Sequence, residues 1–222
     1  MNRYSPVLII DICGTLYKSN TTFDFIKYHF GDSAQFKMIN NFRRNRFVCN
    51  LNYMWFKLTG DDVMRRRLIK ILKGESKDKL VSMAKDFYEN YLLSHRNSQC
   101  FDIIEKYRNN GARLVLVSAT LDIIAKTIAE YENVPEWVAS NLSFDNDRCE
   151  GKIKNDLLKG KLEYTLRLTD NTHFDVITDN YSDGDIIKAS SHSYLVQYSN
   201  KLNKWNRFID KNTFKKCDFI II

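Results

Sequence analysis

The sequence predicts an α/β protein with a three-layer α/β/α, Rossmann-like core built on a parallel sheet, plus an inserted helical domain. Apolar, β-branched runs recur with helical patterns between them, at 7–12, 113–119, 174–179 and 194–198. Such continuous runs are typical of strands buried on both faces of a parallel sheet, and their alternation with helices indicates an α/β fold. The long stretch between the first two runs contains no comparable strand. We therefore expect residues 1–16 and 101–222 to form the core, and residues 17–100 to form the inserted helical domain.

The inserted segment contains helix signals. A helix capped by Asp61 is expected to end near Gly74, with one apolar stripe formed by Met64, Leu68, Ile71 and Leu72. A second helix is expected after Ser76, with Leu80, Ala84, Phe87 and Tyr91 on one face. The earlier part is rich in aromatic residues, which we expect to pack inside a small bundle together with aliphatic ones: Phe23, Ile26, Phe30, Phe36, Ile39, Phe42 and Trp55. The C-terminal tail predicts a helix after Asn200 and a last apolar strand at 218–222.

Composition indicates a compact globular protein in a reducing compartment. Hydrophobic residues make up 44% and charged residues 27% of 222 residues, with only 8 Gly and 2 Pro. The five cysteines are scattered and form no C-x-x-C pair, which argues against disulfides and structural zinc. The first apolar run, Val7 to Ile10, is too short for a signal peptide, and no run approaches the ~18 residues of a membrane span. The expected location is the cytoplasm, with no membrane span.

The formal charge of +7 favours anionic partners. Two basic clusters, at residues 43–46 and 65–67, are the densest positive segments. Neither is accompanied by a zinc-finger spacing or a glycine-aromatic RNA-binding signature. We interpret both clusters as solvated helix faces, and no nucleic-acid partner is expected.

Polar residues follow three of the predicted strands: Asp11, Ser118 and Asp179. The carboxyl ends of parallel strands meet at one edge of a sheet, and that edge is where open α/β sheets bind ligands. Each residue alone could equally cap a helix. Their joint occurrence predicts a site at this edge.

The segment after the first strand reads Asp11-Ile12-Cys13-Gly14-Thr15-Leu16. Gly14 permits a sharp turn, and Thr15 can hold that turn and the Asp11 carboxylate by hydrogen bonds. Ser118 precedes a predicted helix, so its hydroxyl and the first helical amides could bind a phosphate. The alternative for Ser118 is a simple helix cap.

Lys161 and an acidic turn complete the set of candidate residues. Lys161 opens a predicted helix. A lysine gains nothing from the helix dipole at this end, because the dipole favours anions there. Its expected role is therefore to neutralise nearby negative groups. The last motif, Asp179-Asn180-Tyr181-Ser182-Asp183, places two carboxylates four residues apart. Mg²⁺ prefers oxygen ligands and typically takes one or two carboxylates. The alternative is a structural turn rich in Asp and Asn.

Taken in this order, the four segments resemble the motifs of the haloacid dehalogenase superfamily, in its phosphoserine-phosphatase-like branch with a helical cap. The resemblance spans nearly the whole chain and implies a Mg²⁺-dependent phosphohydrolase that forms an aspartyl phosphate on Asp11, with a small phosphorylated metabolite as substrate. It implies catalytic roles for Asp11, Cys13, Thr15, Ser118 and Lys161. It implies phosphate contacts from Ser118, Ala119, Lys161 and Asn180. It implies a metal site formed by Asp11, the backbone carbonyl of Cys13, Asp179 and Asp183.

Cys13 departs from the family pattern, since the family's phosphatases carry a second Asp there that protonates the leaving group and activates water. A thiol has an ordinary pKa of about 8.5, so it is a poor proton shuttle near neutral pH. The metal ligand expected at this position is the backbone carbonyl, which does not depend on the side chain. The cysteine is therefore expected to spare metal binding and to weaken acid–base catalysis. Three functions stay open: a slow or differently assisted phosphatase, a phosphotransferase with a long-lived aspartyl phosphate, and a phosphate-binding protein without turnover. A dehalogenase is disfavoured because it would leave Asp179 without a role.

Overall fold

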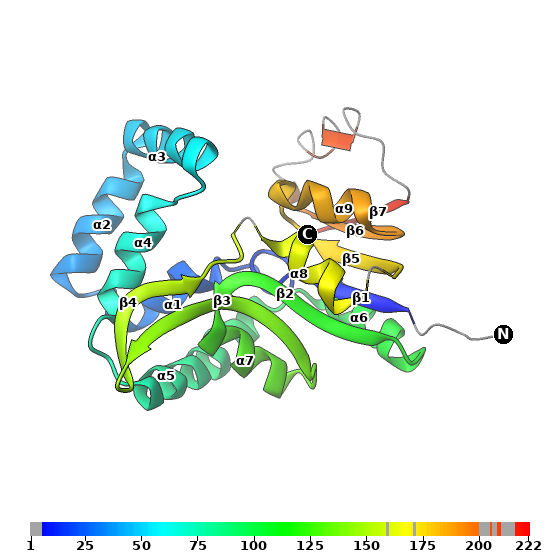
Figure 1. Ribbon diagram of the computed structural model, residues 1–222, viewed down its shortest axis with the longest axis horizontal. Coiled ribbons are helices and arrows are strands. Elements are labelled where there is room, and N and C mark those ends of the chain that lie inside the picture. Colours follow the sequence, from blue (N-terminus) through cyan, green and yellow to red (C-terminus); the bar gives the residue numbers. More distant parts are fainter. Residues whose placement is uncertain (1–5, 159, 171, 200–204, 206–207, 210–215) are drawn as a thin grey trace.

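The computed structural model describes residues 6–158, 160–170, 172–199, 205, 208–209 and 216–222. In these ranges the chain forms a seven-stranded sheet in the order β4-β3-β2-β1-β5-β6-β7, parallel except for the antiparallel pair β3 and β4 (Figure 1). The α/β class and the parallel core sheet predicted from the sequence are confirmed. The strands are β1 Val7–Ile10, β2 Arg113–Leu121, β3 Glu136–Asp145, β4 Arg148–Asn155, β5 Phe174–Thr178, β6 His192–Gln197 and β7 Cys217–Ile221.

Helices connect the strands and cover the sheet. The α-helices are α1 Thr21–Phe30, α2 Ala34–Arg44, α3 Arg46–Thr59, α4 Val63–Ile69, α5 Lys77–Asn90, α6 Ser98–Asn109, α7 Asp122–Tyr131, α8 Lys161–Leu168 and α9 Gly184–Ala189. Short 3-10 turns are η1 Lys70–Leu72, η2 Leu92–His95 and η3 Tyr181–Asp183. Within the described ranges, none of the helices combines the length and the apolar content needed to cross a bilayer.

The central strand β1 explains the layered core. Its side chains alternate between the two faces of the sheet, and all four residues are buried. Leu8 and Ile10 belong to one hydrophobic cluster, together with residues of α6 and α7. Val7 and Ile9 belong to a second cluster, together with residues of α8 and α9. A strand that is apolar on both faces therefore lies between two helical layers, as its continuous apolar run predicts.

The hairpin formed by β3 and β4 is absent from the sequence-based prediction, which recognised only continuous apolar runs. Polar and apolar residues are mixed along both strands, and many of their side chains are half-buried or exposed. Asn146 and Asp147 join the strands with positive φ angles of 45° and 62°, which is the conformation of a tight hairpin turn. The dipeptide Asn-Asp between two β-prone segments was the available signal.

The segment between β1 and β2 is helical as predicted, but two details differ. Asp62, and not Asp61, caps α4, because its carboxylate accepts a hydrogen bond from the backbone amide of Arg65. Phe36 and Ile39 of α2 are buried as expected, whereas Phe42 and Trp55 are about half exposed. The aromatic residues of α3 are therefore not the interior of a bundle. Ser76 caps α5 as predicted.

The helices of this segment differ in what they contact. The first four pack mainly against one another, and α4 also contacts β4. In contrast, α5 packs against α7, and α6 packs against β2. The division of the chain at residues 17 and 100 stays a prediction. The predicted helix after Asn200 lies largely outside the described residues, and the predicted last strand is β7.

Candidate active site

Asp11 lies at the end of β1, at the centre of the site. Its side chain is buried, and its Oδ1 accepts a hydrogen bond from Nζ of Lys161 at 2.9 Å. Lys161 is the first residue of α8, and its ammonium also donates to Oδ2 of Asp183 at 2.9 Å. Burial opposes the charged form of Lys161, but the two neighbouring carboxylates outweigh it and raise its pKa. The structure thus places a charged lysine directly beside Asp11, across 150 residues of sequence.

Thr15 connects Asp11 to Asp179. Its Oγ1 lies 3.3 Å from Oδ2 of Asp11 and 3.3 Å from Oδ1 of Asp179, and it accepts the backbone amide of Asp179 at 2.9 Å. A hydroxyl has one hydrogen, so it can donate to only one of the two carboxylates at a time. The turn after Asp11 requires a glycine at position 14. The φ angle of Gly14 is +70°, and an added Cβ would lie 2.3 Å from Oδ2 of Asp179. The turn therefore brings the two carboxylates to either side of one hydroxyl.

Asp183 is the second carboxylate that contacts the ammonium of Lys161. Its Oδ2 accepts hydrogen bonds from Lys161 and from Oγ1 of Thr178 at 2.8 Å, and the side chain is buried. These contacts orient the lysine toward Asp11. Asn180 precedes the turn η3 and caps it, because its side chain accepts a hydrogen bond from the amide of Ser182 at 3.0 Å.

A cavity of about 240 Å³ opens beside Asp11, and several predicted site residues line it. They are Asp11, Cys13, Ser118, Ala119, Lys161 and Asn180. The helix expected directly after Ser118 begins later, because β2 continues to Leu121 through an irregularity in its pairing with β3. Ser118 therefore lies near its neighbours' backbone amides and not at a helix N-terminus; its Oγ accepts the amide of Thr120 at 3.4 Å.

Cys13 lies on the cavity wall, and its Sγ is 2.7 Å from Oγ1 of Thr21. Thr21 in turn contacts Oγ1 of Thr120 at 2.7 Å. Burial raises the pKa of the Cys13 thiol, and the nearby Asp11 carboxylate raises it further. The thiol is therefore neutral near pH 7, as the sequence-based interpretation expected. The contacts with Thr21 and Thr120 were not predicted, because nothing in their local pattern distinguishes these threonines from ordinary helix-start and strand residues.

Two arginines from the inserted segment also reach the cavity, which corrects their interpretation as parts of solvated faces. Arg65 of α4 donates to the carbonyl of Ala119 at 2.5 Å and to Ser140 at 3.1 Å, and it pairs with Asp156. The guanidinium of Arg43 in α2 packs over the ring of Phe23, with its Cζ 3.6 Å from the ring centroid. The other arginines of the two clusters are exposed. Only the three-dimensional packing distinguishes the two that face inward.

The oxygen groups of the site fit a Mg²⁺ ion. In the described part of the chain, no group of three or more His, Cys, Asp or Glu side chains could hold a metal ion alone. Asp11 and Asp179 belong to the magnesium site predicted from the sequence, and a carboxylate oxygen of each lies 3.3 Å from Oγ1 of Thr15. A site with one or two carboxylates, completed by backbone, water and substrate oxygens, is typical of Mg²⁺.

A buried carboxylate beside a lysine, at the carboxyl edge of a parallel sheet and next to a small cavity, is typical of the active site of an α/β enzyme. The family model of haloacid dehalogenase-like hydrolases matches residues 8–183. The chain belongs to this family of hydrolases. No curated protein shows a significant match to the sequence.

Solved structures agree on the fold. A protein of unknown function from Bordetella pertussis Tohama I matches with a TM-score of 0.72 and 16% identity, over 96% of this chain and 98% of that one. A phosphoserine phosphohydrolase-like protein from Francisella tularensis has a TM-score of 0.66 and 16% identity, over 96% and 94% of the chains. A phosphoserine phosphatase in its apo form has a TM-score of 0.61 and 16% identity, over 96% and 92%. The fold is thus that of phosphoserine-phosphatase-like members.

Proposed function

We propose that the protein is a Mg²⁺-dependent phosphomonoester hydrolase in which Asp11 is the nucleophile. The observation that carries this proposal is the contact between the buried Asp11 carboxylate and Lys161, beside a cavity lined by Ser118. Membership of a hydrolase family and the fold similarity to phosphoserine phosphatases support the reaction class.

In the first step, a carboxylate oxygen of Asp11 attacks phosphorus, and the bond between phosphorus and the leaving-group oxygen breaks. Lys161 and the Ser118 hydroxyl bind the phosphoryl oxygens in this proposal, together with Ala119 and Asn180, and all four residues line the cavity. Asp183 holds Lys161 in place. A Mg²⁺ ion held by Asp11 and Asp179 would neutralise part of the charge on the phosphoryl group.

In the second step, water attacks phosphorus, and the bond between phosphorus and the Asp11 oxygen breaks. The leaving group gains a proton in the first step, and the attacking water loses one in the second. Cys13 stands where the general acid and base is expected, but its raised pKa makes the thiol a weak acid and leaves almost no thiolate to act as a base near pH 7. A missing general acid or base typically costs about 10²- to 10⁴-fold in rate. The protein is therefore a slow phosphatase, or one in which the substrate supplies the proton.

The cavity indicates a small substrate with an additional acceptor group. Its volume of about 240 Å³ suits a small phosphorylated metabolite. Nη1 of Arg43 is buried without a hydrogen-bond partner in the described part of the chain, and an unpaired buried donor of this kind is costly. We propose that a substrate carboxylate, phosphate or hydroxyl accepts this bond.

The free state of all five cysteines supports the proposed reducing, cytoplasmic location.

The test is a screen of phosphorylated metabolites with Mg²⁺ and with a chelator, measuring released phosphate. Steady, Mg²⁺-dependent release supports the phosphatase. A single burst followed by transfer of the phosphoryl group to a second acceptor would instead support a phosphotransferase. Tight binding with neither burst nor release would indicate a phosphate-binding protein.

A further inference from the structure

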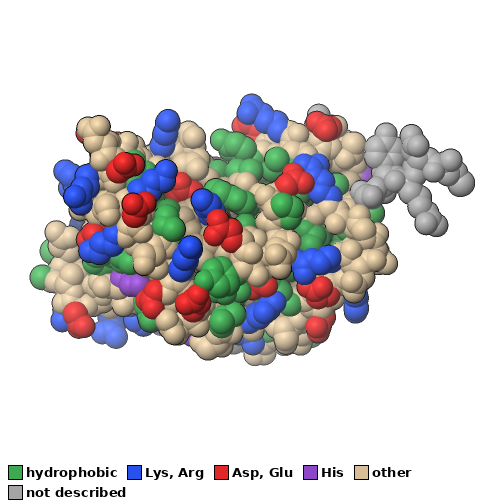
Figure 2. All heavy atoms as spheres, turned by 90° about the horizontal axis from the view of Figure 1, so that it is seen from below, with side chains coloured by type: hydrophobic (Ala, Val, Ile, Leu, Met, Phe, Trp, Pro, Cys, Tyr) green, Lys and Arg blue, Asp and Glu red, His purple; other side chains and the backbone are tan. Residues whose placement is uncertain are grey.

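The outer part of the inserted segment, residues 33–60, has an unusual charge. It contains five basic residues, Lys37, Arg43, Arg44, Arg46 and Lys57, and no acidic residue, so its formal charge is 5 − 0 = +5. Asp32 and Asp61 lie just outside it on either side. We call α2, α3 and their connection at Asn45 the cationic hairpin. Elsewhere the charges are mixed: Figure 2 shows Lys, Arg, Asp and Glu side chains interspersed over the face covered by α5 and α7.

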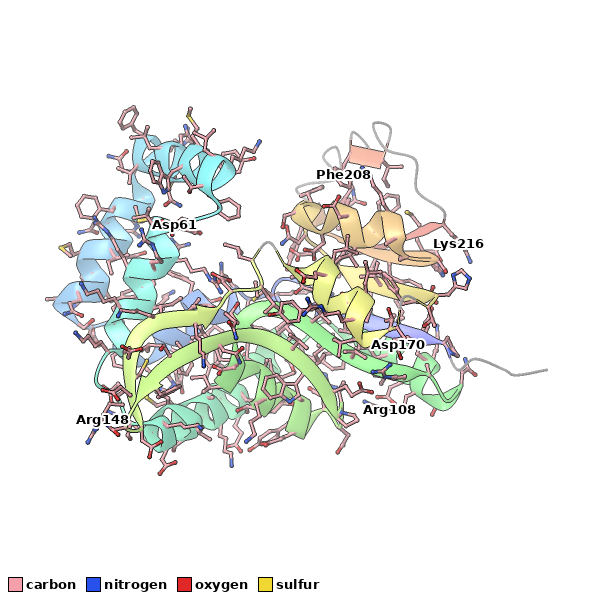
Figure 3. The ribbon with its side chains drawn as sticks, in the orientation of Figure 1. Asp61, Arg108, Arg148, Asp170, Phe208 and Lys216 are labelled. Atoms are coloured by element: carbon pink, nitrogen blue, oxygen red, sulfur yellow. The ribbon has the colours of Figure 1, made fainter. Side chains whose placement is uncertain are left out.

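The cationic hairpin also carries most of the large apolar side chains that the described part of the chain leaves exposed. They are Met38, Phe42, Phe47, Leu51, Tyr53, Met54, Trp55 and Leu58. Leu58 is 82% exposed and Phe47 is 70% exposed, and α3 contains no buried residue. Exposed apolar clusters of this size mark interaction surfaces. Figure 1 shows α3 at the outer end of the segment between β1 and β2, and Figure 3 shows side chains projecting from this helix.

The sequence of α3 places these residues on one face. Phe47, Leu51, Met54 and Leu58 follow a spacing of four, three and four residues, so they form one stripe along the helix. Arg46 and Lys57 lie to one side of this stripe, near its two ends. An apolar stripe flanked by basic residues is typical of a helix that lies in the interface of a membrane.

A groove beside the stripe supports a lipid in preference to a hydrophilic partner. It has a volume of about 410 Å³ and is lined mainly by apolar side chains of α2, α3 and α4, among them Phe42, Leu51, Trp55 and Val63. A nucleic acid or an acidic peptide would match the basic residues but not this groove. A bilayer offers anionic headgroups for the basic residues and acyl chains for the groove.

A second copy of the chain fits the same surface poorly. In an antiparallel pair of α3 helices, Arg46 of one copy would lie near Lys57 of the other, and neither helix offers an acidic residue to pair with them. In a parallel pair, each of these residues would face its own counterpart. We therefore propose that the cationic hairpin docks the protein on the surface of an anionic phospholipid bilayer, with the apolar stripe of α3 inserted between the headgroups.

The direct test is sedimentation of the full chain with phosphatidylcholine vesicles that contain or lack phosphatidylglycerol. We expect binding to the anionic vesicles that weakens with added salt. Each basic residue near an anionic surface contributes about a fivefold change in partition, so the triple variant Arg44→Glu, Arg46→Glu, Lys57→Glu should bind at least about a hundredfold more weakly. A matched control, Lys85→Glu, Lys106→Glu, Lys188→Glu, changes the same net charge at exposed sites elsewhere and should retain much more binding.

The apolar stripe is tested by Leu51→Asp combined with Leu58→Asp, compared with Leu93→Asp, which alters an exposed apolar residue outside the hairpin. Circular dichroism and thermal unfolding verify that each variant folds. Trp55 emission should shift to the blue on anionic vesicles, and Trp55→Phe should lose the shift. Absence of wild-type binding to anionic vesicles would overturn the proposal. So would equal binding by hairpin and control variants, or a hairpin-dependent dimer, detected by light scattering, that binds no vesicles.

Discussion

At the scale of single residues, Cys13 decides how the proposed chemistry differs from that of other phosphatases in the family. Its thiol faces the cavity beside Asp11 but is held neutral by burial and by the neighbouring carboxylate. The proposed nucleophile Asp11 contacts Lys161, and the candidate metal ligands Asp11 and Asp179 both lie beside Thr15. The proposed weakness is therefore confined to proton transfer.

The first prediction is that Cys13→Asp increases hydrolysis. A carboxylic acid at this position can protonate the leaving group, and such a group is typically worth about 10²- to 10⁴-fold in rate. The gain should be largest for alkyl phosphates, whose leaving groups need a proton, and smallest for aryl phosphates with acidic phenols. Initial rates of phosphate release on both substrates measure it. Cys13→Ser is the control and should gain nothing; equal rates for all three proteins would mean that another residue supplies the proton.

The second prediction concerns the ionisation of Cys13. Because its pKa lies above that of an ordinary thiol, its reactive thiolate is scarce at pH 7 and becomes abundant only as the pH rises through that higher pKa. Iodoacetamide should therefore label the exposed Cys49 before Cys13 at pH 7. The labelling rate of Cys13, followed by peptide mass spectrometry, should rise steadily into the alkaline range. Rapid labelling of Cys13 at pH 7 would show that the thiol is ionised and could act as a base.

At the scale of helices and strands, the inserted segment contributes to the site through two arginines. Substitution of Arg43 is expected to affect substrate binding, because its buried Nη1 is the donor proposed to meet the substrate. The loss of one charged hydrogen bond corresponds to about 1.5–3 kcal/mol, so Arg43→Met should raise KM by roughly ten- to a hundredfold with a smaller change in kcat. Steady-state kinetics measure both. The exposed neighbour Arg44→Met should leave KM unchanged; an unchanged KM in Arg43→Met would remove this contact from the proposal.

Arg65 has a structural role that can be separated from binding. It joins α4 to the carbonyl of Ala119 and to Asp156, and its side chain is largely buried. Arg65→Met should lower the free energy of unfolding by about 1–3 kcal/mol, because these bonds are lost where water is scarce. Urea denaturation measures the change. Arg67→Met, on an exposed part of the same helix, should change it by less than about 0.5 kcal/mol; equal effects would contradict this role.

The elements that the sequence predicted best have local causes. The strands β1, β2, β5 and β6 each place apolar side chains in both hydrophobic clusters, and Ser76 caps α5 with its own side chain. The hairpin β3–β4 was missed because its pattern is mixed and its stability depends on pairing. Phe42 and Trp55 were expected in a core, but both are about half exposed, because composition alone does not tell a buried aromatic residue from an exposed one.

At the scale of the whole molecule, the strand order brings the candidate residues together. β1 lies between β2 and β5, so Asp11 and Asp179, which follow β1 and β5, come to the same edge of the sheet as Ser118, which lies within the last part of β2. Polar residues after apolar runs made this convergence predictable. The contacts from the inserted segment were not predictable, because they depend on how its helices pack over that edge.

The central claim, that Asp11 carries the phosphoryl group, is tested most directly by acid-quenching the enzyme during turnover of a phosphorylated substrate and mapping the modification by peptide mass spectrometry. We expect one phosphoryl group on the peptide that contains Asp11, present with Mg²⁺ and absent with a chelator. Asp11→Asn should fold normally, carry no phosphoryl group and release no phosphate. Phosphorylation of a different residue, or turnover by Asp11→Asn at the wild-type rate, would contradict the account.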